Sequence, residues 1–137
     1  MARNLILDSE AISALAHATT SPKAAKRAQA ALASALGMNA LVRVPAPVLA
    51  EVCRGDGRDA AVQRVLRGGV AVVPTTEAVA RRAGALLSAC ELDSRHAVDA
   101  LVVATAIRMG GGIIATHDPN DIARLAAGFA NVKVAEI

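Results

Sequence analysis

The sequence predicts an α/β fold, in which a central parallel sheet of about five strands carries helices on both faces. Short apolar segments alternate with longer helical patterns along all 137 residues, as in consecutive βαβ units. The apolar segments lack regular alternation with polar residues, which is typical of strands buried on both faces. The hydrophobic fraction of 54% provides for a sizeable core and excludes an intrinsically disordered chain.

Glycine, proline and capping residues mark the ends of the predicted elements. The predicted strands cover residues 4–7, 41–44, 70–73, 113–115 and 132–134. The predicted helices cover residues 10–18, 23–36, a segment that begins near 47, 59–66, a segment from about 76 to 90, 97–107 and 121–127. Because no repeat, linker or change of composition interrupts this alternation, we expect residues 1–137 to form a single domain.

The segment 97–107 is the most informative part of the chain. Its only charged residue is Asp99 and its only other polar residue is Thr105, so it predicts a helix that is buried nearly all round, capped by Asp93 or Ser94. A buried carboxylate without a partner is costly. Asp99 therefore needs a cation nearby.

Further carboxylates are expected at the same edge of the sheet. Asp8 ends the first predicted strand, Asp118 follows the fourth, and Glu51 lies in the helix after the second. The carboxyl ends of parallel strands share one edge, and sites form where the strand order reverses. Clustered carboxylates raise one another's pKa unless a cation lies between them, and oxygen ligands suit Mg²⁺ or Mn²⁺. Such an ion can activate water for phosphodiester hydrolysis.

Each acid also has a plainer interpretation. Asp8 can cap a helix, Glu51 can be a solvated helix residue, and Asp118 and Asp121 can be turn formers around Pro119. Asp99 is the hardest to explain in this way, since its neighbours are apolar. The joint pattern therefore carries the prediction.

Composition limits the remaining possibilities. The net charge of +3 permits an anionic partner, and Arg54 and Arg58, which follow Glu51 closely, are the best candidates for phosphate contacts. Phe129 is the only aromatic residue, so a stacking platform for single-stranded bases is nearly excluded. The two cysteines lack the spacing of a zinc site. No apolar run approaches the ~20 residues of a membrane span, so we expect a cytoplasmic protein without membrane contact.

Four segments together resemble the PIN-domain ribonucleases, and more narrowly the VapC-type toxins of type II toxin–antitoxin systems. They are LILDSEAISAL (5–15), PAPVLAEV (45–52), VDALVVATA (98–106) and IIATHDPNDI (113–122), in the family's order and spacing. The resemblance covers nearly the whole chain. It implies an endoribonuclease that depends on Mg²⁺ or Mn²⁺, a cognate VapB-type antitoxin that neutralises it, and a homodimer.

The resemblance also assigns residues. Asp8, Glu51, Asp99 and Asp118 match the family's acidic quartet and would hold the metal, and Asp121 matches a further acid that shares or replaces the role of Asp118. Ser9 and Thr116 match supporting hydroxyls. Glu10 departs from the family, which often has a small polar residue there; if it points inward, it adds negative charge to the site.

Three other functions compete with the toxin. A PIN nuclease with a housekeeping role in RNA processing would use the same chemistry. A catalytically inactive PIN-like binding module is disfavoured because all four acids are present. A phosphatase or receiver-like domain also uses acids at strand ends, but a receiver needs a lysine after a late strand, and the only lysine beyond residue 27 is Lys133, within the last predicted strand.

Overall fold

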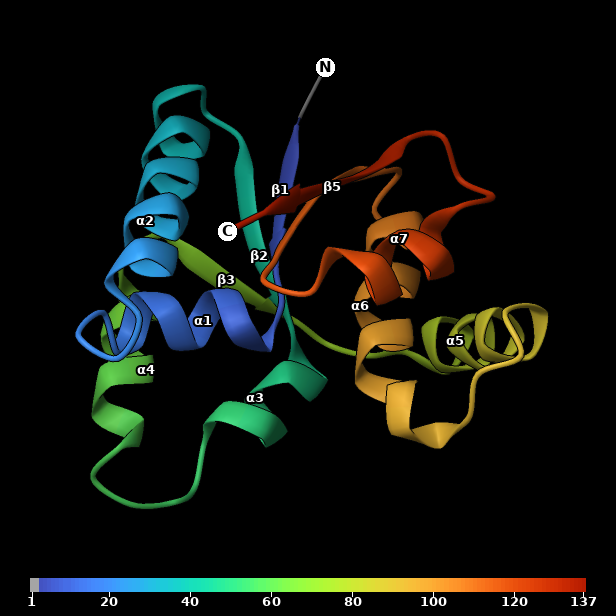
Figure 1. Ribbon diagram of the computed structural model, residues 1–137, viewed down its shortest axis with the longest axis horizontal. Coiled ribbons are helices and arrows are strands. Elements are labelled where there is room, and N and C mark those ends of the chain that lie inside the picture. Colours follow the sequence, from blue (N-terminus) through green and yellow to red (C-terminus); the bar gives the residue numbers. More distant parts are fainter. Residues whose placement is uncertain (1–2) are drawn as a thin grey trace.

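A computed structural model describes residues 3–137 and confirms the predicted α/β class (Figure 1). The strands are β1 (Asn4–Leu7), β2 (Leu41–Pro45), β3 (Val70–Val73), β4 (Gly112–Thr116) and β5 (Val132–Glu136). The helices are α1 (Ser9–Ala16), α2 (Pro22–Gly37), α3 (Ala46–Val52), α4 (Asp59–Arg67), α5 (Glu77–Ala89), the short 3₁₀ turn η1 (Ser94–His96), α6 (Ala97–Arg108) and α7 (Pro119–Ala126).

The five strands form one parallel sheet in the order β3-β2-β1-β4-β5. The chain builds outward from β1 through β2 to β3, then crosses back to place β4 on the other side of β1. Leu5 of β1 consequently pairs with Val42 on one side and Ile113 on the other. The strand order reverses between β1 and β4, so their carboxyl ends mark the point where a site is expected in this class of sheet.

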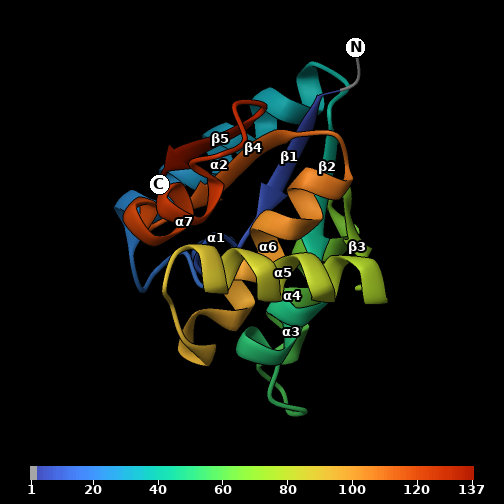
Figure 2. The same ribbon diagram turned by 90° about the vertical axis from the view of Figure 1, so that its right-hand side faces the viewer.

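Helices cover both faces of the sheet. α1, α2 and α4 lie on one side, and α5, α6 and α7 lie on the other (Figure 1). Figure 2 shows α5 as the outer layer over α6, which itself packs against several strands. None of the helices in residues 3–137 is both long and apolar enough to cross a lipid bilayer.

The core is built around β1 and α6. Ile6 and Leu7 are fully buried, because β1 has a strand on each side and helices on both faces. In α6, Ala100 and the run from Val102 to Ala106 are buried, as the nearly continuous apolar sequence predicted. The α6 hydroxyl of Thr105 is satisfied within the helix by donating to the Leu101 carbonyl oxygen at 2.7 Å.

The residue that caps α6 and the start of α7 differ from the sequence prediction. Asp93 caps the 3₁₀ turn η1 by accepting the Arg95 N–H, so the residue at the amino end of α6 is His96. α7 begins at Pro119 instead of Asp121, because proline at the first helical position has the required φ and no N–H to leave unpaired. This early start places Asp121 in the first turn of the helix.

The turn between α6 and β4 depends on glycine. Gly112 has φ of +153°, and a Cβ there would lie 2.8 Å from the Asn4 carbonyl oxygen and 2.9 Å from Ile6 Cδ1. A side chain at Gly112 would therefore strain the backbone and push against the central strand.

We expect Gly112→Ala to lower the free energy of unfolding by about 2–4 kcal/mol, through this strain and overpacking. The control is Gly84→Ala in α5, where a Cβ meets nothing within 4 Å. Alanine there should be neutral or stabilise by about 0.5–1 kcal/mol. Urea unfolding followed by circular dichroism measures the free energy of unfolding of both variants. Equal effects of the two substitutions would contradict the role given to Gly112.

Candidate metal centre

A cavity of about 620 Å³ opens at the carboxyl edge of the sheet, beside the ends of β1 and β4. Its walls carry four acids from three helices and the end of β1: Asp8, Glu10, Glu51 and Asp99. The sequence had separated these side chains by up to 91 positions. The fold therefore brings together three of the four predicted acids and adds Glu10 to them.

Asp8 both caps a helix and belongs to the acidic cluster. The residue is 4% exposed, and its Oδ1 accepts the Ala11 N–H of α1 at 2.9 Å. The pKa of Asp8 is raised to about 6, mainly because the carboxyl group is buried. The hydrogen bonds from the Thr116 hydroxyl and the Ala11 N–H lower this pKa, and the charge of Glu10 raises it. Asp8 therefore fits both interpretations that the sequence left open, the helix cap and the acid of a metal site.

Asp99 lies in the first turn of α6 and is surrounded by negative charge. Its pKa rises to about 6, first through burial and then through the charges of Asp8, Glu51 and Asp121; His96 acts in the opposite direction. The cation that the sequence led us to expect is not a lysine or arginine, because no such side chain in residues 3–137 forms an ion pair with Asp8, Glu51 or Asp99.

Two hydroxyl groups hold this part of the site together. Ser9 at the start of α1 donates a hydrogen bond from Oγ to Oε1 of Glu51, which ties α3 to the end of β1. Thr116 at the end of β4 accepts the Asp118 N–H at 3.1 Å and also hydrogen-bonds Asp8. Both residues therefore contact acids of the predicted quartet.

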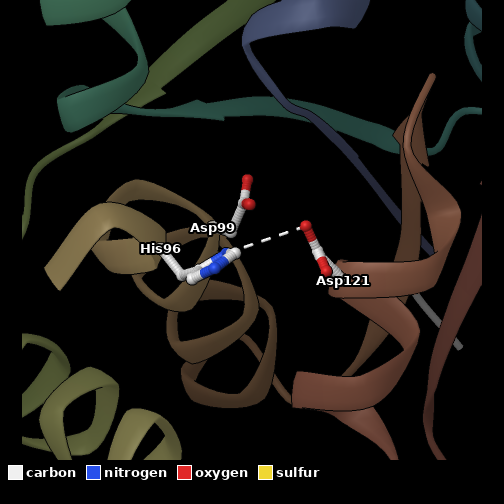
Figure 3. A group of neighbouring side chains, drawn as sticks. All are labelled: His96, Asp99 and Asp121. Atoms are coloured by element: carbon white, nitrogen blue, oxygen red, sulfur yellow. Dashed lines mark ion pairs between the residues drawn. The ribbon is translucent and has the colours of Figure 1, made fainter. Parts of the chain in front are cut away.

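Asp118 and Asp121 occupy different places. Asp121 faces Asp99 and lies beside His96, with 3.7 Å between Asp121 Oδ2 and His96 Nδ1 (Figure 3). Asp118 is exposed, and its charge acts on Glu10 instead. The sequence left the choice between these two acids open, and in the structure Asp121 is the one next to Asp99.

Glu10 lines the same cavity as Asp8, Glu51 and Asp99. Partial burial raises its pKa, His117 lowers it, and the charges of Asp118, Asp99 and Glu51 raise it further. The departure from the family pattern at this position therefore does add negative charge to the site.

Arg54 and Arg58 lie in the connection between α3 and α4, and both guanidinium groups bind local partners. Arg58 pairs with Asp56 at 2.6 Å, and Arg54 donates to the carbonyl oxygens of Ala50 and Cys53. These contacts are largely exposed, so phosphate could replace them at little cost.

The composition of the cluster fits a hard divalent cation. Its ligand atoms are carboxylate oxygens, one acid is almost fully buried, and the charges that raise the pKa of Asp99 have no compensating arginine or lysine pair among residues 3–137. Oxygen ligands and uncompensated charge are what Mg²⁺ and Mn²⁺ require. A cation between these carboxylates would stabilise the charged forms of Asp8 and Asp99 against the burial and the neighbouring charges that raise their pKa.

Comparison with known proteins agrees with this geometry. The family model of the PIN domain matches residues 5–128. A chain in the crystal structure of VapBC2 from Rickettsia felis, bound to a DNA fragment from their promoter, superposes with a TM-score of 0.66 at 12% identity and covers 98% of each chain. A chain of a toxin–antitoxin complex from Klebsiella pneumoniae gives 0.67 at 20% identity, covering 97% of this chain and 99% of the other. No curated protein matches.

The raised pKa values predict how metal-free protein responds to pH. Folded Asp99 holds its proton up to pH of about 6, whereas an unfolded aspartate loses it near about 3.9, so this group's contribution to stability is complete below pH 4 and is lost as the pH rises through 6. Asparagine does not ionise, so Asp99→Asn removes the loss of stability that ionisation of Asp99 causes. In EDTA it should raise the free energy of unfolding at pH 7.5 by about 1–2 kcal/mol, with little difference from wild type at pH 4.

Denaturant unfolding at the two pH values measures this difference, with Glu77→Gln as a control on an exposed acid of α5. If Asp99→Asn destabilised the metal-free protein at pH 7.5, the charged form of Asp99 would not be disfavoured by its burial and its neighbours, and the raised pKa would be contradicted.

Proposed function

Because the chain belongs to the PIN-domain family, whose members are nucleases, we propose that it is a metal-dependent endoribonuclease that hydrolyses RNA phosphodiester bonds. We further propose that it acts as the VapC-type toxin of a toxin–antitoxin pair. The observation that carries the nuclease proposal is the group of acids at the β1/β4 edge, whose charges have no lysine or arginine pair among the described residues.

In this proposal Asp8, Glu51 and Asp99 hold the ion, and Asp121 is preferred to Asp118 as the fourth acid because it faces Asp99. When bound, Mg²⁺ or Mn²⁺ supplies a Lewis acid and lowers the pKa of water for attack on the phosphodiester. The chain's own part is to fix the carboxylates. The Ala11 N–H and the Thr116 hydroxyl orient Asp8, and the Ser9 hydroxyl orients Glu51.

RNA is held in this proposal by charge and hydrogen bonds instead of base stacking. Phe129 is the only aromatic residue, and it does not line the acidic cavity. The Arg82 guanidinium carbon lies over the Phe129 ring, 5.6 Å from the centre of that ring. The polar groups on the cavity wall beyond the acids are Ser9, Ser13, His17, Thr20, Ser21 and His117. Arg54 and Arg58, which follow Glu51 in the connection between α3 and α4, are the proposed phosphate contacts.

The toxin role draws its support from the two structural neighbours, which come from a VapBC2 assembly and a toxin–antitoxin complex and match this chain along nearly its whole length. A VapB-type antitoxin is the corresponding partner, and a homodimer is the proposed assembly. A housekeeping nuclease and an inactive binding module are the alternatives. Growth arrest on expression, relieved by a co-expressed antitoxin, would favour the toxin over the housekeeping enzyme.

The nuclease proposal is tested by cleavage of a mixed RNA substrate with Mg²⁺ or Mn²⁺. We expect wild-type protein to cut RNA, EDTA to abolish cutting, and Asp99→Asn to lower the rate by about a hundredfold or more, because the substitution removes a metal ligand. Glu77→Gln, an exposed substitution on α5 outside the cavity, should leave the rate unchanged.

Folded wild-type protein that cuts none of the RNAs with either metal would contradict the nuclease proposal and favour the binding module. Cleavage that persists in both EDTA and Asp99→Asn would contradict the metal assignment.

A further inference from the structure

A histidine adjoins the acidic cluster at the junction of α6 and α7. His96, Asp99 and Asp121 each offer a ligand atom, and these atoms all lie within 4.8 Å of one another (Figure 3). Asp99 and His96 are three residues apart, which places them on one side of the start of α6, and Asp121 comes from the first turn of α7, which packs against α6. All three side chains are partly buried.

The His96 side chain forms no hydrogen bond within the part of the chain that the structure describes. His96 occupies the capping position of α6, but its side chain makes no capping hydrogen bond. The separation of 3.7 Å between His96 Nδ1 and Asp121 Oδ2 is longer than a hydrogen bond, so these two groups face each other without forming one. The His96 side chain is 24% exposed, and its ring is directed toward Asp121 in Figure 3.

The spacing of the three groups suits a single ion. Metal–ligand bonds of about 2.1 Å place opposite ligands about 4.2 Å apart, so a limit of 4.8 Å requires only small side-chain movement. The donor set is one nitrogen and two carboxylates. Imidazole nitrogen binds first-row transition ions well, whereas Mg²⁺ is bound mainly through oxygen.

We propose that His96 is a nitrogen ligand of an ion held by Asp99 and Asp121, and that it gives this site a preference for transition metal ions such as Mn²⁺ over Mg²⁺. The inference rests on the metal dependence proposed above and adds to it the identity of a ligand and the class of ion. His96→Gln tests it, because glutamine is of similar size and offers only an amide oxygen as a ligand.

The experiment uses full-length protein freed of metal and loaded with Mn²⁺. Electron spin echo spectroscopy detects nitrogen bonded to Mn²⁺, and loss of the free Mn²⁺ signal gives the affinity. Wild type should show imidazole nitrogen modulation, and His96→Gln should abolish it. The control is His17→Gln, at a histidine that lines the cavity but lies outside the trio, and it should retain the modulation. His96→Gln should weaken Mn²⁺ binding by about tenfold or more, and Mg²⁺ binding, measured by competition, by much less.

Three results would overturn the inference. Nitrogen modulation that persists in His96→Gln would mean that another group supplies the nitrogen ligand. An equal loss of Mn²⁺ and Mg²⁺ affinity would mean that His96 acts only by positioning Asp121. Unchanged affinity for both ions would mean that it has no role. Wild-type protein that binds neither ion would instead contradict the proposed metal dependence itself. Thermal unfolding in EDTA confirms that each variant is folded before binding is compared.

Discussion

The burial of carboxylates beside one another at one edge of the sheet is the constraint on which the site depends. Burial and the neighbouring charges raise the pKa values of Asp8 and Asp99 to about 6, so at neutral pH the fold holds ionised groups in an environment that disfavours their charge. No lysine or arginine pairs with these two acids in residues 3–137. A cation that binds beside them therefore stabilises the folded protein. Ion binding and folding are therefore expected to be coupled.

The fold can hold these charges because rigid, apolar elements carry them. β1 is the central strand, paired on both sides, and Asp8 follows its buried Leu7 directly. Asp99 extends from α6, which is buried along most of its length. The hydrogen bonds from Ala11 to Asp8 and from Ser9 to Glu51 then fix the carboxylates relative to this framework. The reversal of strand order between β1 and β4 leaves room for a cavity at this edge.

The sequence predicted the sheet and much of the acidic cluster, because both follow from strong local patterns. Apolar runs located the strands, and Asp99 was recognisable as a charge within an apolar helix. The relation of Asp121 and His96 to Asp99 depended on where helices begin. Asp121 turns toward α6 because α7 starts at Pro119, and His96 lies there because a 3₁₀ turn precedes α6. The spacing of three between His96 and Asp99 is the signal in the sequence for this contact, and the same spacing also suits a histidine that merely caps the helix.

The most direct test of the account is to locate the ion. Crystals soaked in Mn²⁺, with diffraction data collected near the manganese absorption edge, give a peak wherever the ion binds. The account predicts a peak at the carboxyl edge of β1 and β4, among the carboxylates of Asp8, Glu51, Asp99 and Asp121. A well-diffracting crystal with no peak there, or with the ion bound at Asp118 away from Asp99, would contradict it.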